Sequence, residues 1–170
     1  MAVTQPAGST VEYALRDGVA VVELRRPAAG NALDAALRRE LLAAVQQIRA
    51  DGDQVRSVLL AAQGRHFCVG QDLKEHAHAL ETRPESAFAL LREEYNPLVT
   101  ELRALPQPVV VAVEGACVGA GLGLALCADV RVAARGGGGG GHFPTPLPGP
   151  RLAAHSGTHR PLATDVRLSR

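Results

Sequence analysis

The chain of 170 residues lacks tryptophan, has few aromatic residues (3%) and carries a formal net charge of only +1. Binding to nucleic acid is not expected, because phosphate contacts require a clustered surplus of basic residues. Three cysteines and no charged-then-apolar leader argue against a secreted disulfide scaffold. No apolar run approaches the roughly 20 residues of a bilayer span, so no membrane association is expected. These absences favour a cytoplasmic protein with one domain of ordinary size.

The composition changes sharply near residue 135. Residues 136–170 begin with six consecutive glycines, and Pro144, Pro146, Pro148 and Pro150 stand at every second position. Proline lacks the backbone donor that a strand needs and disrupts helix interiors, so neither element is expected there. We therefore predict a folded core over residues 1–135 and a tail over 136–170 that is disordered or poorly packed.

The core alternates between strand and helix patterns. Two β-prone runs flank Asp17-Gly18, a strong hairpin signal. Asn31 is the expected N-cap of a helix that ends at Asp51-Gly52, with Asp34 completing a capping box. The other expected elements are strands over 55–61, 108–113 and 130–133, an amphipathic helix over 88–105 that Pro97 kinks or splits, and a helix after the glycine-rich turn near 123. Strands separated by helices in this order predict an α/β fold with a mostly parallel sheet.

Two turns carry the small residues that a backbone binding site needs. Each follows a buried strand and leads toward a helical segment: residues 66–73 read HFCVGQDL, and residues 114–123 read EGACVGAGLG. Small residues let backbone N–H groups approach a ligand, and two converging N–H groups would form an oxyanion hole. The alternative is that these glycines only permit close packing of helix against strand. The glycine spacing at 119–123 is not that of the dinucleotide-binding fingerprint.

These turns belong to a larger set of segments that resembles the crotonase superfamily, the enoyl-CoA hydratase/isomerase family. The segments are Arg26-Pro27 with Asn31-Ala32-Leu33, FCVGQDL at 67–73, LPQPVVVAVEG at 105–115, and GAG at 119–121 followed by LALCAD at 124–129. They occur in the family's order and spacing over about residues 10–135. The resemblance implies a crotonase-like (ClpP/crotonase) α/β fold with a ββα-type spiral core, incomplete here at the C-terminus.

The resemblance also implies a function and a set of site residues. Family members bind acyl-CoA thioesters as substrates, need no further cofactor, and stabilise the thioester enolate with two backbone N–H groups. By motif position these donors are Gln71 and Ala120. The residues implied in substrate or CoA binding are Ala28, Ala29, Gly30, Gly70, Asp72, Leu73, Lys74, Gly119 and Gly121. For Lys74 the alternative is a solvated charge at a helix start. No metal site is expected, because no group of His, Cys and Asp has ligand spacing.

The sequence departs from the hydratase pattern at Gly123, where the resemblance places the first of two hydratase glutamates. A glycine cannot transfer a proton, so the chain is expected to be more isomerase-like than hydratase-like. Isomerases of the family use one base further along the chain. A weak match to that pattern places His155 at the position of this base. An imidazole can serve as a general base near neutral pH. His76 and His78 are interpreted instead as solvated surface residues, and Cys68 and Cys117 as small buried fillers.

Two hypotheses remain open. The first is an enzyme that acts on acyl-CoA thioesters by enolate stabilisation. The second is a non-catalytic crotonase-like remnant that binds CoA weakly or only oligomerises, which Gly123 and the altered tail favour. The family forms homotrimers and hexamers, an assembly that is doubtful for so short a chain. A related serine protease of the Clp type is disfavoured, because the turn after residue 119 offers no nucleophilic serine. The glycine run could also mark a frame slip, which the DNA sequence would reveal.

Overall fold

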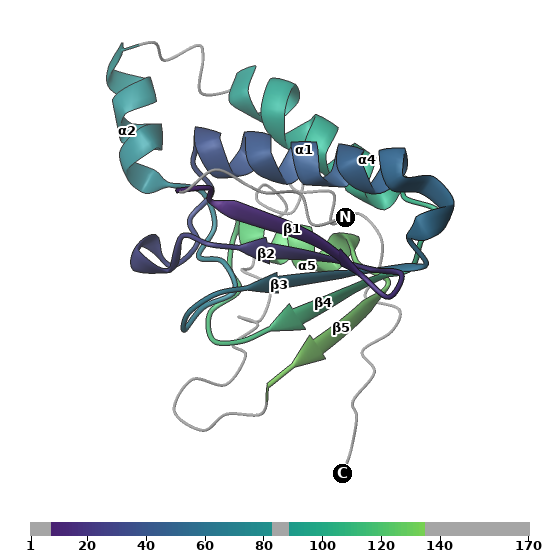
Figure 1. The fold of residues 1–170 in the computed structure, drawn as a ribbon. Helices are drawn as coiled ribbons and strands as arrows, with labels where there is room; N and C mark the ends of the chain where they lie inside the picture. Colours follow the sequence, from purple (N-terminus) through teal and green to yellow (C-terminus); the bar gives the residue numbers. More distant parts are fainter. Residues whose placement is uncertain (1–7, 83–88, 135–170) are drawn as a thin grey trace.

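The computed structural model describes residues 8–82 and 89–134, which form a five-stranded sheet with helices packed against it (Figure 1). The strands are β1 (Val11–Arg16), β2 (Val19–Leu24), β3 (Ser57–Ala62), β4 (Val109–Val113) and β5 (Val130–Ala133). The helices are α1 (Ala35–Asp51), α2 (Leu73–Thr82), α4 (Asn96–Arg103) and α5 (Ala120–Cys127), with 3-10 turns at Pro27–Ala29 and Gly52–Gln54 and a π-helical turn at Leu91–Tyr95. The predicted tail from residue 136 lies outside the described residues.

The sheet has the order β1-β2-β3-β4-β5, and only its first pair is antiparallel. The turn between β1 and β2 places Asp17 at φ 49° and Gly18 at φ 79°, the left-handed conformation that a tight hairpin turn requires. The hairpin and the mostly parallel sheet are both confirmed. Because β2, β3 and β4 run parallel, the loops that follow them leave from the same edge of the sheet.

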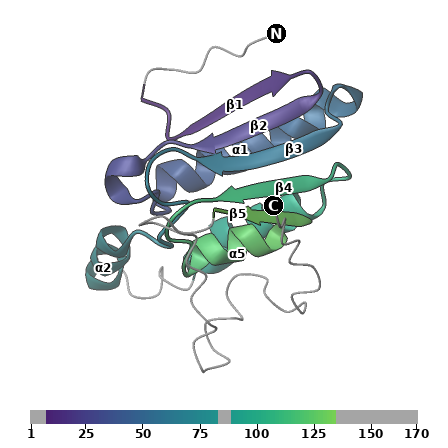
Figure 2. The same cartoon turned by 90° about the horizontal axis from the view of Figure 1, so that it is seen from below.

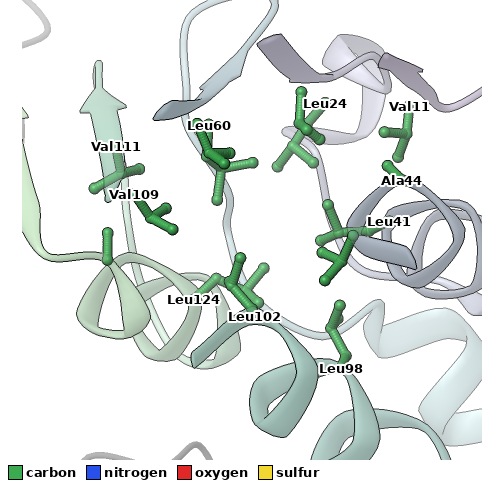
Figure 3. Packing of buried hydrophobic residues seen from close by; sticks show 14 of the residues in the cluster. Val11, Leu24, Leu41, Ala44, Leu60, Leu98, Leu102, Val109, Val111 and Leu124 are labelled. Carbon is green, nitrogen blue, oxygen red and sulfur yellow. The ribbon is translucent and has the colours of Figure 1, made fainter. Parts of the chain in front are cut away.

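The core lies between the sheet and the helices α1, α4 and α5. Alternate residues of β1 to β4 are buried, as the two-residue period of a strand dictates, and they point toward the helices (Figure 3). Leu24, Leu60 and Val111 from the strands face the helical layer, to which Leu41 of α1, Leu102 of α4 and Leu124 of α5 contribute. Figure 2 shows the same arrangement from below, with α2 set apart from the main helical layer.

The start of α1 differs from the sequence expectation. The N-cap is Asp34, whose carboxylate accepts a hydrogen bond from the Leu37 N–H at 2.9 Å. Asn31 lies outside the helix with φ 54° and is fully buried. Both residue types cap helices well, but asparagine also tolerates the left-handed conformation that this turn needs. The predicted capping box at Asn31 is therefore wrong by one turn.

The helical stretch around Pro97 is not split, because the π-helical turn at Leu91–Tyr95 continues directly into α4. Pro97 occupies the first turn of α4, and the wider turn before it shifts the hydrogen-bond register where the proline N–H is missing. The π-helical turn at Leu91–Tyr95 precedes it and delivers Tyr95 into the core. No helix within the described ranges is long and apolar enough to cross a membrane.

Candidate active site

The two turns singled out in the sequence lie against one another at the edge where β3 and β4 end. Cys68 and Cys117 form an isolated parallel β-bridge that joins them. The Cys68 N–H donates to the Ala116 carbonyl at 3.2 Å, and the Val118 N–H donates to the Cys68 carbonyl at 3.1 Å. Segments almost 50 residues apart in sequence are thus hydrogen-bonded as if they were neighbouring strands.

Two glycines let these turns come into direct backbone contact. A Cβ atom added to Gly70 would lie 3.1 Å from the Val118 carbonyl oxygen and 3.5 Å from the Ala120 nitrogen. A Cβ added to Gly119 would lie 3.7 Å from the Gly70 Cα. Both glycines also have positive φ, at 96° and 54°. The residues that follow them, Gln71 and Ala120, are therefore close to one another in space.

The backbone N–H groups of Gln71 and Ala120 are the two donors expected from the sequence. Ala120 is the first residue of α5, where a helix leaves its N–H groups unpaired. Gln71 pairs with Leu33 in a parallel bridge, but the bonds of that bridge use Gly70 and Asp72. Within residues 8–82 and 89–134, no hydrogen bond occupies either of these two N–H groups.

A third loop, between β2 and α1, completes the edge. The Leu33 N–H donates to the Gly70 carbonyl at 2.8 Å, and the Val69 N–H donates to the Gly30 carbonyl at 3.1 Å. These bonds bring the expected CoA-binding residues of the first loop, Ala28, Ala29 and Gly30, alongside those of the second, Asp72, Leu73 and Lys74. The site residues expected from the sequence and placed in the described part of the chain thus lie on three adjoining loops and on the first turns of α2 and α5.

Asn31 holds these loops together. Its amide nitrogen donates to the carbonyls of Gln63 at 2.9 Å and His66 at 2.8 Å, and its Oδ1 accepts from the Arg26 N–H at 2.8 Å. The side chain is fully buried, so its hydrogen bonds stand in for those that the three backbone groups would otherwise make with water. Sequence reasoning gave Asn31 a helix-capping role and missed this one.

Replacing Asn31 with alanine is expected to lower the free energy of unfolding by about 2–4 kcal/mol, because buried carbonyls lose their donor and alanine disfavours a positive φ. Chemical denaturation measures the loss. Asn31→Gly keeps the backbone conformation accessible and removes the same hydrogen bonds, so it isolates their contribution. A loss of less than about 1 kcal/mol in both variants would contradict this role.

The carboxylate of Asp72 makes hydrogen bonds that stabilise the fold. Its Oδ2 accepts from the Arg26 guanidinium at 2.7 Å, and its Oδ1 accepts from the N–H groups of Lys74 and Glu75 at 3.0 and 3.3 Å. The hydrogen bond from Arg26 is the main reason that the pKa of Asp72 is lowered, although burial opposes it. Asp72 therefore stays ionised and orients the first turn of α2.

The buried Arg38 fixes that same turn to α1. Its guanidinium donates to Glu75 at 2.6 Å, to Glu94 at 2.7 Å and to the Leu33 carbonyl at 2.8 Å. Glu75 also accepts from the Ala35 N–H at 2.7 Å. Sequence reasoning missed this network, although a charged residue among the apolar positions of α1 was a visible signal.

The histidine and cysteine candidates differ in their burial and in their contacts. Cys68 and Cys117 are buried, and burial raises the pKa of their thiols to about 11 and about 12. His78 is exposed, as expected, but His76 is half-buried and its Nδ1 lies 3.1 Å from the side-chain nitrogen of Gln71. The interpretation of His76 as solvated surface is therefore wrong. His155 lies outside the described residues.

Metal binding finds no support in the part of the chain that the structure covers. Across residues 8–82 and 89–134, no three His, Cys, Asp or Glu side chains are grouped to hold an ion. The chemistry of the edge is instead that of exposed backbone N–H groups, small residues and a few apolar side chains.

Sequence comparison decides the family. The profile described as enoyl-CoA hydratase/isomerase matches residues 14–138. The chain belongs to this family. A protein from Rhodobacter capsulatus named probable enoyl-CoA hydratase is 45% identical over 115 residues, which are 66% of this chain and 41% of that protein. The 1,2-epoxyphenylacetyl-CoA isomerase of Escherichia coli is 40% identical over 105 residues, covering 61% and 39% of the two chains.

Solved structures confirm the crotonase-like fold of this family member. A protein from Mycobacterium abscessus assigned as an enoyl-CoA hydratase/isomerase superimposes with a TM-score of 0.67 at 53% identity. The match covers 71% of this chain and 46% of that one. The chain thus spans less than half the length of these family members. Its described part contains the hairpin, the parallel strands and the two turns.

Proposed function

We propose that this family member binds acyl-CoA thioesters and stabilises their enolate form with the backbone N–H groups of Gln71 and Ala120. One observation supports the proposal: Gly70 and Gly119 are in contact, and among the described residues no hydrogen bond is found to the N–H of either following residue. A pair of fixed donors at one point is what an oxyanion hole requires.

The chemistry follows from where negative charge develops. Removing a proton from the carbon next to the thioester moves an electron pair onto the carbonyl oxygen. Two N–H dipoles that are already in place stabilise this charge without rearranging in the transition state. Ala120 is also the first residue of α5, so the positive end of the helix dipole adds to the effect.

The rest of the thioester is assigned to the neighbouring loops. Ala28, Ala29 and Gly30 offer small residues for close approach of the CoA moiety, and Lys74 offers a cation to its phosphates. Leu73 is 78% exposed and Val69 is 37% exposed. Large apolar side chains open to water at this edge suit the aliphatic part of a CoA ester.

An isomerase activity is favoured over hydration because Gly123 brings no carboxylate to the site. Gly123 lies buried in α5 at the position where the resemblance expects a glutamate. Relatives named as a hydratase and as an isomerase both match the chain, so the distinction rests on this residue. Fatty acid metabolism as the setting, and the cytoplasm as the location, stay predictions.

An absorbance assay with 2-enoyl-CoA and 3-enoyl-CoA tests the proposal on the full chain. We expect conversion of the 3-enoyl to the 2-enoyl thioester and little hydration of the latter. Substantial hydration would contradict the isomerase preference. Failure to turn over either thioester would contradict the enzymatic proposal.

The second candidate is a non-catalytic protein that binds CoA weakly or contributes only to an oligomer. Gly123 supports it, because the buried glycine in α5 brings no carboxylate to the site. Calorimetric binding of a saturated acyl-CoA without turnover of either enoyl thioester would favour this candidate. Sedimentation analysis would show whether the chain forms the trimer or hexamer expected of the family.

A further inference from the structure

The imidazole of His76 lies beside the proposed oxyanion hole. The side-chain nitrogen of Gln71 is 3.1 Å from Nδ1 of His76, and the backbone N–H of the same Gln71 is one of the two proposed donors. The imidazole therefore contacts the same residue whose backbone N–H is proposed to bind the thioester oxygen.

The fold fixes the direction in which His76 points. The His76 N–H donates to the Asp72 carbonyl at 3.0 Å, which closes the first turn of α2. Glu75, one residue earlier, is held toward α1 by Arg38 and by the Ala35 N–H. Successive residues of a helix point about 100° apart, so anchoring Glu75 to α1 turns His76 toward Gln71.

Several titratable groups near the two turns are already hydrogen-bonded or buried. Asp72 is bonded to Arg26, Glu75 to Arg38, and Nδ1 of His66 accepts from the Ala116 N–H at 3.1 Å. Burial keeps the thiols of Cys68 and Cys117 protonated by raising their pKa values. Among the described groups next to these turns, the imidazole of His76 is the one in contact with the Gln71 side chain, and an imidazole can both accept and donate a proton.

The geometry points to His76 as the group that moves the proton in this site, an inference that rests on the proposed function. Nε2 of the neutral imidazole takes a proton from C2 of a 3-enoyl thioester, and the electron pair passes to the carbonyl oxygen held by Gln71 and Ala120. The imidazolium returns the proton to C4, and the electron pair moves back to form the C2–C3 double bond. The proton is conserved, and no co-reactant is consumed.

The Gln71 side chain supports both states of the ring. A half-turn of its amide presents Oε1 to an Nδ1–H, which leaves Nε2 free to accept a proton and stabilises the imidazolium once it forms. The opposite amide orientation donates to Nδ1 and leaves the proton on Nε2. This arrangement follows the base-and-orienting-partner pattern of general acid–base catalysis.

The test compares His76→Gln and His76→Ala with the full wild-type chain. Glutamine can still hydrogen-bond to Gln71 but cannot carry a proton, so it separates proton transfer from a holding role. We expect both variants to lose about 100-fold or more in 3-enoyl-CoA isomerisation and in deuterium incorporation at C2 in D₂O. The exposed His78, changed to glutamine on the same helix, is the matched control and should keep the wild-type rate.

The outcomes separate this inference from the proposed function. Calorimetry with a saturated acyl-CoA reports binding alone, and its dissociation constant should change by less than about threefold in the His76 variants. If the wild-type chain binds and isomerises while His76→Gln is equally active, the role of His76 is overturned and the oxyanion hole stands. If the wild-type chain does not bind the acyl-CoA, the proposed function itself fails.

Discussion

Replacing Gly115 with alanine is expected to lower the free energy of unfolding by about 3 kcal/mol or more. Gly115 has φ 58°, and an added Cβ would fall 1.8 Å from the Arg65 carbonyl oxygen and 2.7 Å from Nδ1 of His66. A positive φ alone disfavours an L-residue by about 1–2 kcal/mol. The collision with backbone then forces the loop after β3 away from the turn after β4. Urea denaturation followed by circular dichroism measures the loss.

Gly52→Ala is the matched control for this prediction. Gly52 has nearly the same φ, 52°, but an added Cβ would meet nothing within 4 Å. Its loss should be confined to the conformational part, about 1–3 kcal/mol, because φ 52° with ψ −123° is sparsely populated by L-residues. Similar losses for the two variants would show that the packing of Gly115 against Arg65 is unimportant, contrary to the structure described above.

Ala120→Pro is expected to lower the turnover number by about 100- to 1,000-fold while the fold persists. Proline removes one of the two proposed donors, and loss of a single oxyanion-hole donor has an effect of this size. Ala120 is the first residue of α5, a position where helices accept proline because its N–H has no intrahelical partner. Steady-state kinetics with 3-enoyl-CoA measure the effect.

Two measurements keep this result interpretable. Thermal unfolding should show that the Ala120→Pro chain folds with a stability close to that of the wild type. Ala120→Ser retains the N–H and is expected to be far less affected in turnover. Equal rates for the proline and serine variants, with both chains folded, would rule out the Ala120 N–H as a donor.

Much of the fold follows from short patterns that act locally. The strands at Val19–Leu24 and Val130–Ala133 occur at the predicted residues, because apolar β-branched runs between turn signals leave little choice. The π-helical turn directly before Pro97 reflects the missing N–H of this proline, although the helix is not split there. The hairpin follows from Asp17-Gly18, where both residues accept a positive φ.

The errors arise where two local rules compete or where a partner is distant in sequence. Asn31 and Asp34 are both good N-caps, and only the loops contributed by Gln63 and His66 decide that Asn31 serves them instead. Arg38 can be buried because its charge is paired with Glu75 and Glu94, which come from other helical segments. Sequence spacing reveals neither partnership.

The candidate site shows the same division. The resemblance identified the two turns, and the structure brings them together through the pairing of Cys68 with Cys117. His76 was misjudged because the pattern of α2 is polar on most sides, with none of its residues fully buried. Its contact with Gln71, five residues earlier, depends on how Arg38 and Asp72 orient the helix.

The bonds between the three loops also determine how the site can open. Across the two turns, Cys68 donates a hydrogen bond to Ala116 and accepts one from Val118. On the other side of the same segment, the Leu33 N–H donates to the Gly70 carbonyl. Separating any one of these loops breaks bonds that hold the next, so local unfolding must involve all three at once. We therefore expect the edge to open as a single cooperative unit, so that both proposed N–H donors would be lost together.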